Sequence, residues 1–466
     1  MEKIDSKIGL EVHYQLDVGK LFCNCPSILR EENPDFIIKR KLKTSAGELG
    51  EIDETALYEF KKQKEFWYET YNDSNCLVEL DEEPPHSINE KALDVVLQLC
   101  LLLNTQIVDQ IQIMRKTVID GSNTSGFQRT ILIGRNGFIE TSKGKVKIAT
   151  ICLEEDAARK IQETPSYIIY RLDRLGIPLI EITTHPDIKT PEHGKEVAQL
   201  IGMYVKSTGK TRGGIGSIRQ DLNISINNKP RIEIKGVQDL RTIPRIIENE
   251  IKRQSNLKEI KSEVRKVNID LTTDYLRPMP GAARMYPETD IPSINITQEK
   301  INLIKLPELL TEKAIRLEKD FNLNSEISNL VIKEKLDIIS LTKKFSNIEP
   351  SLIATTYLLT PKEIKKRFGI NIKTKDIEET LSYYNDKKIP KDAIQKILIE
   401  RTQNKKIDLN KYKTSSSELE RDIRKIIQKH KDLTFQAYMG LIMKKYRGKA
   451  NGQEIAEILK RYIKQI

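Results

Sequence analysis

The feature that most constrains the fold is a change in the spacing of apolar residues near Pro292. Before this point, apolar residues recur at every second position in many short segments separated by Gly and Pro, which is typical of β-strands. From about Asn295, long segments rich in Lys, Glu, Ile and Leu, such as residues 306–330, have the 3.6-residue spacing of amphipathic helices. The sequence therefore predicts an α+β chain with a strand-rich first part and a helical second part.

The helical part divides again at a polar stretch, residues 404–417, which fits a linker. A length of 466 residues agrees with about three domains, and we expect them at residues 1–292, 293–405 and 406–466. In the last of these, Ser417 with Glu420 and Asn451 with Glu454 form capping boxes, and each pair predicts the start of a helix.

Positive charge is concentrated at the end of the chain. Residues 421–466 hold 12 Lys or Arg and 4 Asp or Glu, so they carry +8 of the total formal charge of +11. A solvated helical face would explain any one basic helix. A separate basic bundle favours contact with a phosphate backbone, where Lys and Arg gain from counterion release.

Composition excludes several classes of protein. With 31% charged and 38% hydrophobic residues, the chain is not intrinsically disordered. Five cysteines are too few for a disulfide framework and indicate a reducing compartment. The first residues lack the apolar core of a signal peptide, and the longest apolar run, Val95–Leu103, is too short to span a membrane. We expect a soluble, cytoplasmic protein with no membrane partner.

Four strand-like segments share one pattern, in which apolar residues typical of a core alternate with residues that carry ionisable or hydrogen-bonding side chains. The segments are residues 7–16, 179–185, 217–226 and 231–235. Their polar sides carry Glu11, His13 and Gln15; Glu181, Thr183 and His185; Arg219, Asp221, Asn223 and Ser225; and Glu233 and Lys235. A half-exposed antiparallel sheet gives such alternation by itself, but solvent faces usually favour Thr, Lys and Ser over clustered carboxylates.

If these segments are neighbours, their carboxylates repel one another unless cations lie among them. Oxygen-rich sites suit Mg²⁺ bound together with phosphates, which predicts an ATP-like substrate held through the metal. Lys116, Arg219 and Lys235 would then balance charge on phosphoryl oxygens.

The spacing of the glycines excludes two common nucleotide-binding motifs. The glycines before Gly209-Lys210-Thr211 are too far away for a P-loop, and Arg219 stands where a dinucleotide fingerprint needs its last glycine. Cys23 and Cys25 form a Cys-x-Cys without a second pair at zinc spacing, so metal binding there is left open. No Ser or Cys lies in a nucleophile motif.

Many long blocks in residues 7–292 resemble one family, the E subunits (GatE) of the archaeal glutamyl-tRNA(Gln) amidotransferase, which belong to the GatB/GatE group. The blocks are IGLEVHYQLDVGKLFCNCP, CLVELDEEPPH, MRKTVIDGSNTSGFQRT, LEEDAARK, YRLDRLGIPLIEITTHPDI, GIGSIRQDLNISI, EIKGVQDLR and ARMYPETDIP. The regions after Pro292 are similar to the family's helical domain and to its basic, YqeY-like tail domain, which binds tRNA.

The resemblance implies a cradle-shaped, antiparallel-sheet domain related to glutamine synthetase, and a carbon-nitrogen ligase activity. ATP would phosphorylate the side-chain carboxylate of glutamate esterified to tRNA(Gln), and ammonia would then displace phosphate to give glutaminyl-tRNA(Gln). The chemistry needs cations, because both the carboxylate and ATP are anions that must be brought together. ATP and Mg²⁺ are the implied cofactors.

The resemblance also implies roles for individual residues. By position in the motifs, the Mg²⁺ ligands would be Glu11, His13, Glu155 and Glu181. The residues that line the nucleotide and acyl-phosphate site would be Lys116, Arg219, Asp221, Asn223 and Lys235. The plain alternative for each is an ordinary ion pair within the sheet.

The implied partners are glutamyl-tRNA(Gln) and GatD, an asparaginase-like amidase that supplies ammonia, in a dimer of heterodimers. One departure stands out: residues 267–282 pass directly to the YPETDIP block, where the family carries an inserted domain that engages tRNA. Two rival functions stay open, a GatB-like enzyme that also acts on aspartyl-tRNA(Asn) and a tRNA-binding protein without catalysis.

Overall fold

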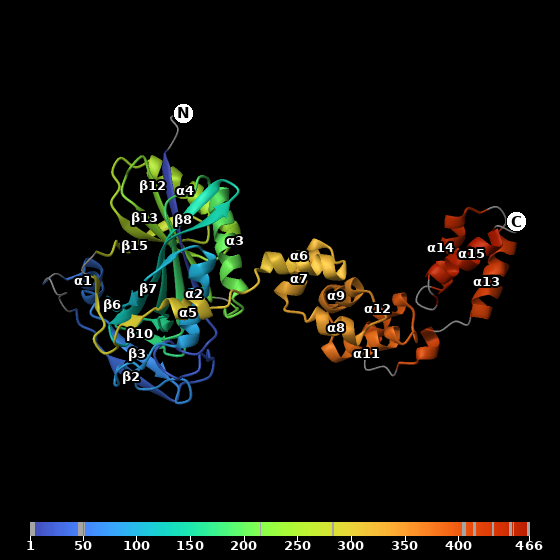
Figure 1. The fold of residues 1–466 in the computed structure, drawn as a ribbon, viewed down its shortest axis with the longest axis horizontal. Coiled ribbons are helices and arrows are strands. Elements are labelled where there is room, and N and C mark those ends of the chain that lie inside the picture. Colours follow the sequence, from blue (N-terminus) through green and yellow to red (C-terminus); the bar gives the residue numbers. More distant parts are fainter. Residues whose placement is uncertain are drawn as a thin grey trace. The chain divides into compact units, whose positions relative to one another are not determined.

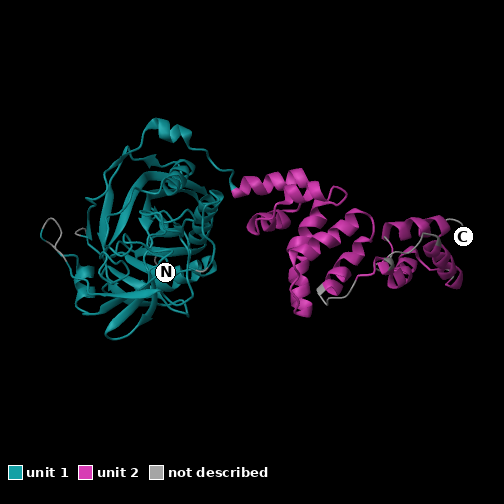
Figure 2. Cartoon of the chain, turned by 90° about the horizontal axis from the view of Figure 1, so that it is seen from below, with its two compact units in different colours: residues 1–309 teal, residues 310–466 magenta. Residues whose placement is uncertain are grey.

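The computed structural model describes residues 5–44, 50, 52–214, 216–281, 284–402, 407–412, 416–430, 433–446, 450 and 452–463. Its strands lie between residues 6 and 295, and from residue 298 onward the described elements are helices (Figure 1), so the predicted change in secondary structure is confirmed. The chain is α+β. It separates into two compact units, residues 1–309 and 310–466 (Figure 2).

The first unit contains all the strands and five of the α-helices that the structure describes. The strands are β1 (Ser6–Gln15), β2 (Phe36–Arg40), β3 (Glu65–Thr70), β4 (Gln106–Ile107), β5 (Gln110–Ile111), β6 (Ile113–Thr117), β7 (Phe127–Thr141), β8 (Gly144–Glu155), β9 (Arg159–Glu163), β10 (Tyr167–Arg171), β11 (Pro178–Thr184), β12 (Ile218–Ile226), β13 (Ile232–Val237), β14 (Glu263–Val267), β15 (Thr273–Pro278), β16 (Met285–Pro287) and β17 (Ile294–Asn295). The helices are α1 (Glu54–Phe60), α2 (Glu90–Leu102), α3 (Pro191–Ser207), α4 (Ile243–Ser255) and α5 (Gln298–Leu303).

The large sheet has the strand order β15-β14-β13-β12-β1-β11-β8-β7-β6-β16, with β4 paired to β7. Its described pairs are antiparallel except β13 with β14, which is parallel. The alternation predicted from the sequence is confirmed, because Ile8, Leu10 and Val12 of β1 are fully buried in the core. Apolar faces of α2, α3 and α4 cover this side of the sheet, which leaves the other side for polar residues.

Helix α2 shows why an apolar run in this chain is a core helix. The side chain of Asn89 caps its first turn by accepting the backbone N–H of Ala92, and the apolar residues that follow are buried against β7 and β8. Among the helices that the structure describes, none is long and apolar enough to cross a membrane.

A smaller sheet, β2-β3-β10-β9, has its own apolar cluster that includes Phe66, Tyr68 and Tyr170. The connections that lead to and from this sheet are long. Residues 16–35, between β1 and β2, and residues 71–89, between β3 and α2, contain no helix or strand. Such segments need other contacts to fix them.

The second unit is helical. Its described helices are α6 (Leu310–Phe321), α7 (Ser325–Lys333), α8 (Ile338–Lys344), α9 (Pro350–Leu358), α10 (Thr360–Phe368), α11 (Thr374–Asn385), α12 (Ile394–Thr402), α13 (Ser416–Lys429), α14 (Phe435–Tyr446) and α15 (Gly452–Ile463). One apolar cluster joins α6 to α12 with Tyr412, and a second joins α13, α14 and α15.

Two sequence predictions differ in detail from the structure. The helical pattern of residues 306–330 is two helices, because Asn322 has a positive φ of 50° and Asn324 caps α7 by accepting the backbone N–H of Ile327. Helix α13 starts one residue before Ser417. The predicted cap side chains of Ser417 and Asn451 lie outside the described residues.

The core of the first unit continues past the expected boundary at residue 292. Ile296 belongs to its main apolar cluster, and Ile301 and Ile304 of the following segment pack against it. Between β14 and β16 the chain passes only through β15 and short connections, so no further domain lies among the described residues of this stretch.

Candidate active site

The four segments predicted to share one design are consecutive neighbours in the large sheet, in the order β13-β12-β1-β11. Register places Glu11 between Asp221 and Thr183, and His13 between Arg219 and Glu181. Their polar side chains therefore point to the same side of the sheet. We call this side the polar face; with its continuation on β8, β7 and β6 it carries Glu11, His13, Lys116, Gln128, Thr130, Cys152, Glu154, Glu181, Arg219, Asp221, Asn223, Glu233 and Lys235.

Glu11, His13 and Glu181 form the centre of the polar face. The Nε2 atom of His13 lies 3.3 Å from Oε1 of Glu11 and 3.4 Å from Oε2 of Glu181. A ligand atom from each of the three lies within 4.8 Å of the others, and each side chain is at most 20% exposed. The structure thus brings together three of the four residues for which a metal role was predicted.

We call Glu11, His13 and Glu181 the triad. The pKa values of its members are shifted by burial and by the closeness of the two carboxylates. Burial raises the pKa of Glu11 to about 7, and the charge of Glu181 adds to the rise. Burial also disfavours the charged form of Glu181, but hydrogen bonding to His13 and the charge of Lys116 hold its pKa well below the usual range. Burial opposes protonation of His13 as well, yet Glu181 and Glu11 raise its pKa.

The donor set therefore fits a divalent cation. Two carboxylates and an imidazole converge, and burial together with the charge of Glu181 disfavours the ionised form of Glu11. Carboxylate oxygens are the protein ligands that Mg²⁺ prefers, and one or two of them are usual where the ion is shared with phosphates.

Two half-buried ammonium groups flank the triad. Lys116 Nζ lies 2.5 Å from Oε1 of Glu154 and 4.0 Å from Oε2 of Glu181, and Lys235 Nζ lies 2.6 Å from Asp221 and 2.5 Å from Glu233. Burial alone would lower the pKa of both lysines, but these carboxylates raise it, so both remain charged. The face thus holds fixed positive charge on either side of its carboxylates.

Arg219 is oriented by Asp156, a fully buried carboxylate just after β8. Asp156 accepts hydrogen bonds from Arg219 Nη2 at 2.6 Å and from Gln15 Nε2 at 2.5 Å. Among the described residues, Nε of Arg219 and Oδ1 of Asn223 are buried without a hydrogen-bond partner. Unpaired buried groups of this kind are costly, and a bound ligand would satisfy them.

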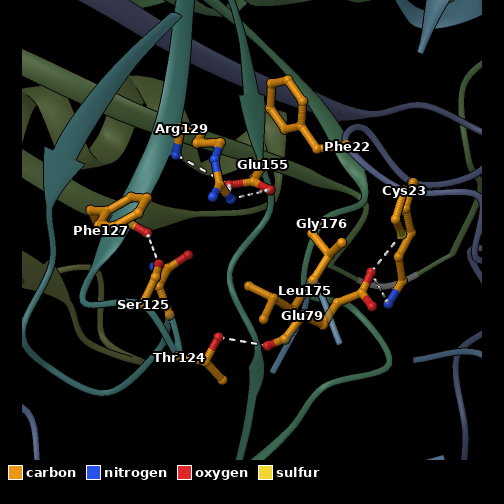
Figure 3. A pocket seen from close by; sticks show the side chains of 13 residues that line it. Phe22, Cys23, Glu79, Thr124, Ser125, Phe127, Arg129, Glu155, Leu175 and Gly176 are labelled. Carbon is orange, nitrogen blue, oxygen red and sulfur yellow. Dashed lines mark hydrogen bonds and ion pairs between the residues drawn. The ribbon is translucent and has the colours of Figure 1, made fainter. Parts of the chain in front are cut away.

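Glu155 is not part of the triad. Its carboxylate accepts from the backbone N–H and the guanidinium of Arg129, at 3.2 and 3.3 Å (Figure 3). Side chains alternate along β8, and Glu155 shares its side with Ile151 and Leu153 of the core. This placement corrects the expectation that Glu155 is a metal ligand beside Glu11.

The adjacent Glu154 occupies the polar face instead. It accepts hydrogen bonds from Lys116 at 2.5 Å, from Thr130 Oγ1 at 2.9 Å and from Gln128 Nε2 at 3.1 Å. The sequence-based prediction missed Glu154, although alternation from the apolar Ile151 and Leu153 could have assigned it to the polar side. It also missed Asp156, which lies beyond the strand, where no periodic signal exists.

The family of the chain is shown by comparison with known proteins. The model of the GatB/GatE catalytic domain matches residues 6–302. The E subunit of glutamyl-tRNA(Gln) amidotransferase from Methanocaldococcus jannaschii is 38% identical over all of this chain and 99% of that protein. The proteins of the same name from Methanococcus maripaludis and Sulfurisphaera tokodaii are 36% and 35% identical, each over at least 99% of both chains.

The sheet with its polar face is thus the catalytic domain of a tRNA amidotransferase subunit. The chain belongs to the GatB/GatE family, and the three relatives named above are E subunits of glutamyl-tRNA(Gln) amidotransferase. The alignment with the Methanocaldococcus jannaschii protein runs over 625 positions, whereas this chain has 466 residues. That relative therefore contains segments for which this chain has no residues, in agreement with the missing insert.

Proposed function

We propose that this chain is the component that activates glutamyl-tRNA(Gln) for amidation. It has the three parts expected from the sequence: a catalytic domain at residues 1–292, whose core extends to Ile304, a helical domain at 293–405 and a tRNA-binding tail at 406–466. The observation that carries the proposal is the polar face, where a carboxylate-imidazole triad lies between two half-buried lysines. A relationship of this domain to glutamine synthetase belongs to the proposal, as does a cytoplasmic location.

The proposed reaction has two steps. An oxygen of the glutamyl side-chain carboxylate attacks the γ-phosphorus of ATP, the bond to the bridging oxygen breaks, and ADP leaves. Ammonia from a partner amidase, GatD, then attacks the acyl carbon, phosphate leaves, and loss of a proton gives the amide. Both reactants of the first step are anions, so positioning and charge neutralisation are the main tasks of the protein.

The side chains of the polar face are suited to these tasks. Lys116, Lys235 and Arg219 would balance charge on phosphoryl and carboxylate oxygens, and the unpaired atoms of Arg219 and Asn223 are available for hydrogen bonds. Because opposite charges hold each lysine in place, little reorganisation is needed when substrate binds.

Glu11, His13 and Glu181, with Glu154 beside them, would hold Mg²⁺. The ion would neutralise phosphate charge and orient ATP. Asp221 has a different role in this proposal, since its carboxylate is engaged with Lys235 and fixes that ammonium group.

The experiment is ADP release by the purified chain with its co-purifying amidase, given Mg²⁺, ATP and glutamyl-tRNA(Gln). We expect release with the charged tRNA and none with uncharged tRNA. Equal release with aspartyl-tRNA(Asn), together with a different co-purifying amidase, would favour the GatB-like enzyme. No release with any charged tRNA would favour a binding protein without catalysis.

A further inference from the structure

The two ends of the large sheet each bring an arginine to the side of the polar face: Arg277 of β15, and Arg284, which directly precedes β16. Among the described residues, no carboxylate forms an ion pair with either of them. Elsewhere on the sheet such groups are paired, as Arg219 is with Asp156. The guanidinium of Arg284 makes one hydrogen bond to the part of the chain that the structure describes, from Nε to the backbone carbonyl of Thr117 at 3.0 Å. Both arginines are half-buried, so water shields their charge only in part.

The curvature of the sheet explains how its two ends meet. Strands β15 and β16 are first and last in the order of ten strands, so nine spacings, or about 43 Å, would separate them in a flat sheet. The chain passes from Pro278 at the end of β15 to Met285 at the start of β16, and a connection of this length spans at most about 25 Å. The sheet must therefore curve until its ends approach each other.

Register and contacts place both guanidinium groups next to the residues of the polar face. Arg277 pairs with Val264 of β14, which pairs with Glu233 of β13, and paired residues on neighbouring strands point to the same side. Arg284 precedes the strand that pairs with β6, on which Lys116 lies. Besides burial, the charge of Arg284 acts to lower the pKa of Lys116, so these two cations are neighbours.

The two arginines carry more positive charge than their surroundings balance. Burial lowers the pKa of Arg284, the charge of Arg277 lowers it further, and nearby carboxylates offset this only in part. These carboxylates belong to Asp53, Asp120 and Glu154. A guanidinium stays charged at every physiological pH, so loss of a proton does not remove the imbalance. An anionic ligand would remove it.

Phosphate is the anion that suits this arrangement. Guanidinium groups bind phosphate oxygens through paired hydrogen bonds, and both arginines have donors that no described residue uses. Lys116, the neighbour of Arg284, lies 4.0 Å from Glu181 of the triad, so the arginines adjoin the place expected for the cation that binds ATP. ATP brings several negative charges, whereas a glutamyl side chain brings one. A chain of linked phosphates therefore matches two guanidinium groups beside a lysine.

We propose that Arg277 and Arg284 bind the phosphate chain of ATP beside Lys116. The inference rests on the function proposed above and adds to it two residues from opposite ends of the sheet. A ligand held by both arginines also links the first and last strands, so ATP should stabilise the folded catalytic domain.

The first test is binding of ATP with Mg²⁺ to the full chain, purified with its co-purifying amidase and without tRNA. Calorimetric titration should show an affinity reduced by roughly 10- to 100-fold in Arg277→Gln and in Arg284→Gln, because each loses a charged donor. Arg284→Lys should have an intermediate affinity, since an ammonium group keeps the charge but not the paired donors. Arg245→Gln is the matched control, because Arg245 is exposed on α4, which covers the opposite side of the sheet. Unchanged affinity in both Gln variants, or a wild-type chain that binds no ATP, would overturn the proposal.

A second measurement separates a role in binding from a role in folding. Without nucleotide, the urea midpoint of Arg284→Gln should not fall below that of the wild-type chain, because the substitution removes a charge that its surroundings do not balance. ATP should raise the midpoint of the wild-type chain more than that of the variant. A lower midpoint without nucleotide, together with an unchanged effect of ATP, would show that Arg284 serves only the fold.

Binding of glutamyl-tRNA(Gln) distinguishes the phosphates of ATP from those of tRNA. Filter binding should give equal tRNA affinities for the wild-type chain and Arg284→Gln. A reduced tRNA affinity with an unchanged ATP affinity would overturn the proposal. Failure of the proposed function has a different signature, in which the wild-type chain binds ATP but releases no ADP with any charged tRNA, and the ATP affinities of the arginine variants still decide the present inference.

Discussion

Glu154 and Glu155 are adjacent in the chain but serve opposite sides of the large sheet. Glu154 is held by Lys116 on the polar face, whereas Glu155 is held by Arg129 on the side of the core. Both carboxylates are buried, so exposure does not distinguish them. Direction along the strand does, because consecutive side chains point to opposite faces.

This difference predicts opposite phenotypes for two matched substitutions. Glu154→Gln removes negative charge beside the triad and should reduce ATP-dependent ADP release by roughly 100-fold or more. Glu155→Gln weakens the hold on a buried guanidinium and should lower the free energy of unfolding by about 1 to 3 kcal/mol while ADP release is largely retained. ADP assays and urea unfolding of both variants measure the two effects. Equal loss of ADP release at unchanged stability would contradict the assigned orientations.

At the scale of elements, the short strand β16 is fixed to the edge of the sheet by the carboxylate that follows it. Glu288 is buried and bonds to Arg115 of β6 and, at 2.8 Å, to Nε of Arg129 of β7. Burial would raise the pKa of Glu288, but Arg115, the backbone N–H of Asp290 and Arg129 together lower it to about 2. The block ARMYPETDIP therefore contributes the carboxylate that fixes β16 to β6 and β7, next to Lys116.

The ion pairs of Glu288 predict a pH-dependent contribution to the free energy of unfolding. The folded chain binds a proton at Glu288 only near pH 2, whereas the unfolded chain does so near 4.5, so the stabilisation is complete above about pH 5 and is lost as the pH falls toward 2. At neutral pH, Glu288→Gln should lower the free energy of unfolding by on the order of 3 kcal/mol, and the difference from wild type should shrink in acid. Urea unfolding between about pH 7 and about pH 3 measures it.

The control for this pH series is Glu140→Gln, since the side chain of Glu140 is 66% exposed and pairs only with the exposed Lys145 among the described residues. This variant should follow the wild-type curve within a few tenths of a kcal/mol. A Glu288→Gln chain whose difference from wild type were constant across the series would show that the carboxylate is not ionised in the folded protein.

At the scale of the whole molecule, besides the apolar cluster of the small sheet, three apolar clusters lie in successive parts of the chain. The largest lies beneath the polar face, a second joins α6 to α12, and a third holds α13, α14 and α15 together. The third cluster uses only residues from Leu419 onward. The last part of the chain, whose residues 421–466 carry +8 of the total formal charge of +11, thus contains its own core.

Removal of residues 417–466 should therefore weaken binding of tRNA without loss of the apolar clusters in the rest of the chain. Because counterion release drives contacts of Lys and Arg with phosphate, the salt dependence of binding should also become shallower, by roughly one unit of log-log slope per lost contact. Filter binding or fluorescence titration of glutamyl-tRNA(Gln) at several salt concentrations measures both effects.

A milder version of this test replaces Lys425 and Lys429, which are exposed on α13, with Gln. The fold of the tail should persist, since Ile423 and Ile427 on the other side of the helix are the buried contacts. A smaller decrease in slope is expected for this variant. Unchanged binding at every salt concentration in both variants would remove the tail from the tRNA site.

Sequence alone determined the parts of this protein that rest on periodicity. The change from strands to helices near Pro292, the apolar sides of β1, β11, β12 and β13 and the polar residues between them follow from alternation, because burial of one face selects side chains locally. The family blocks identified Glu11, His13 and Glu181, and the structure brings these three together.

Only the tertiary structure decided which strands are neighbours and that Cys76 and Glu79 lie beside Cys23 and Cys25. These facts depend on contacts between residues far apart in the chain. Strand order and the meeting of two irregular connections are set by the packing of the whole domain, and neither leaves a periodic trace in the sequence.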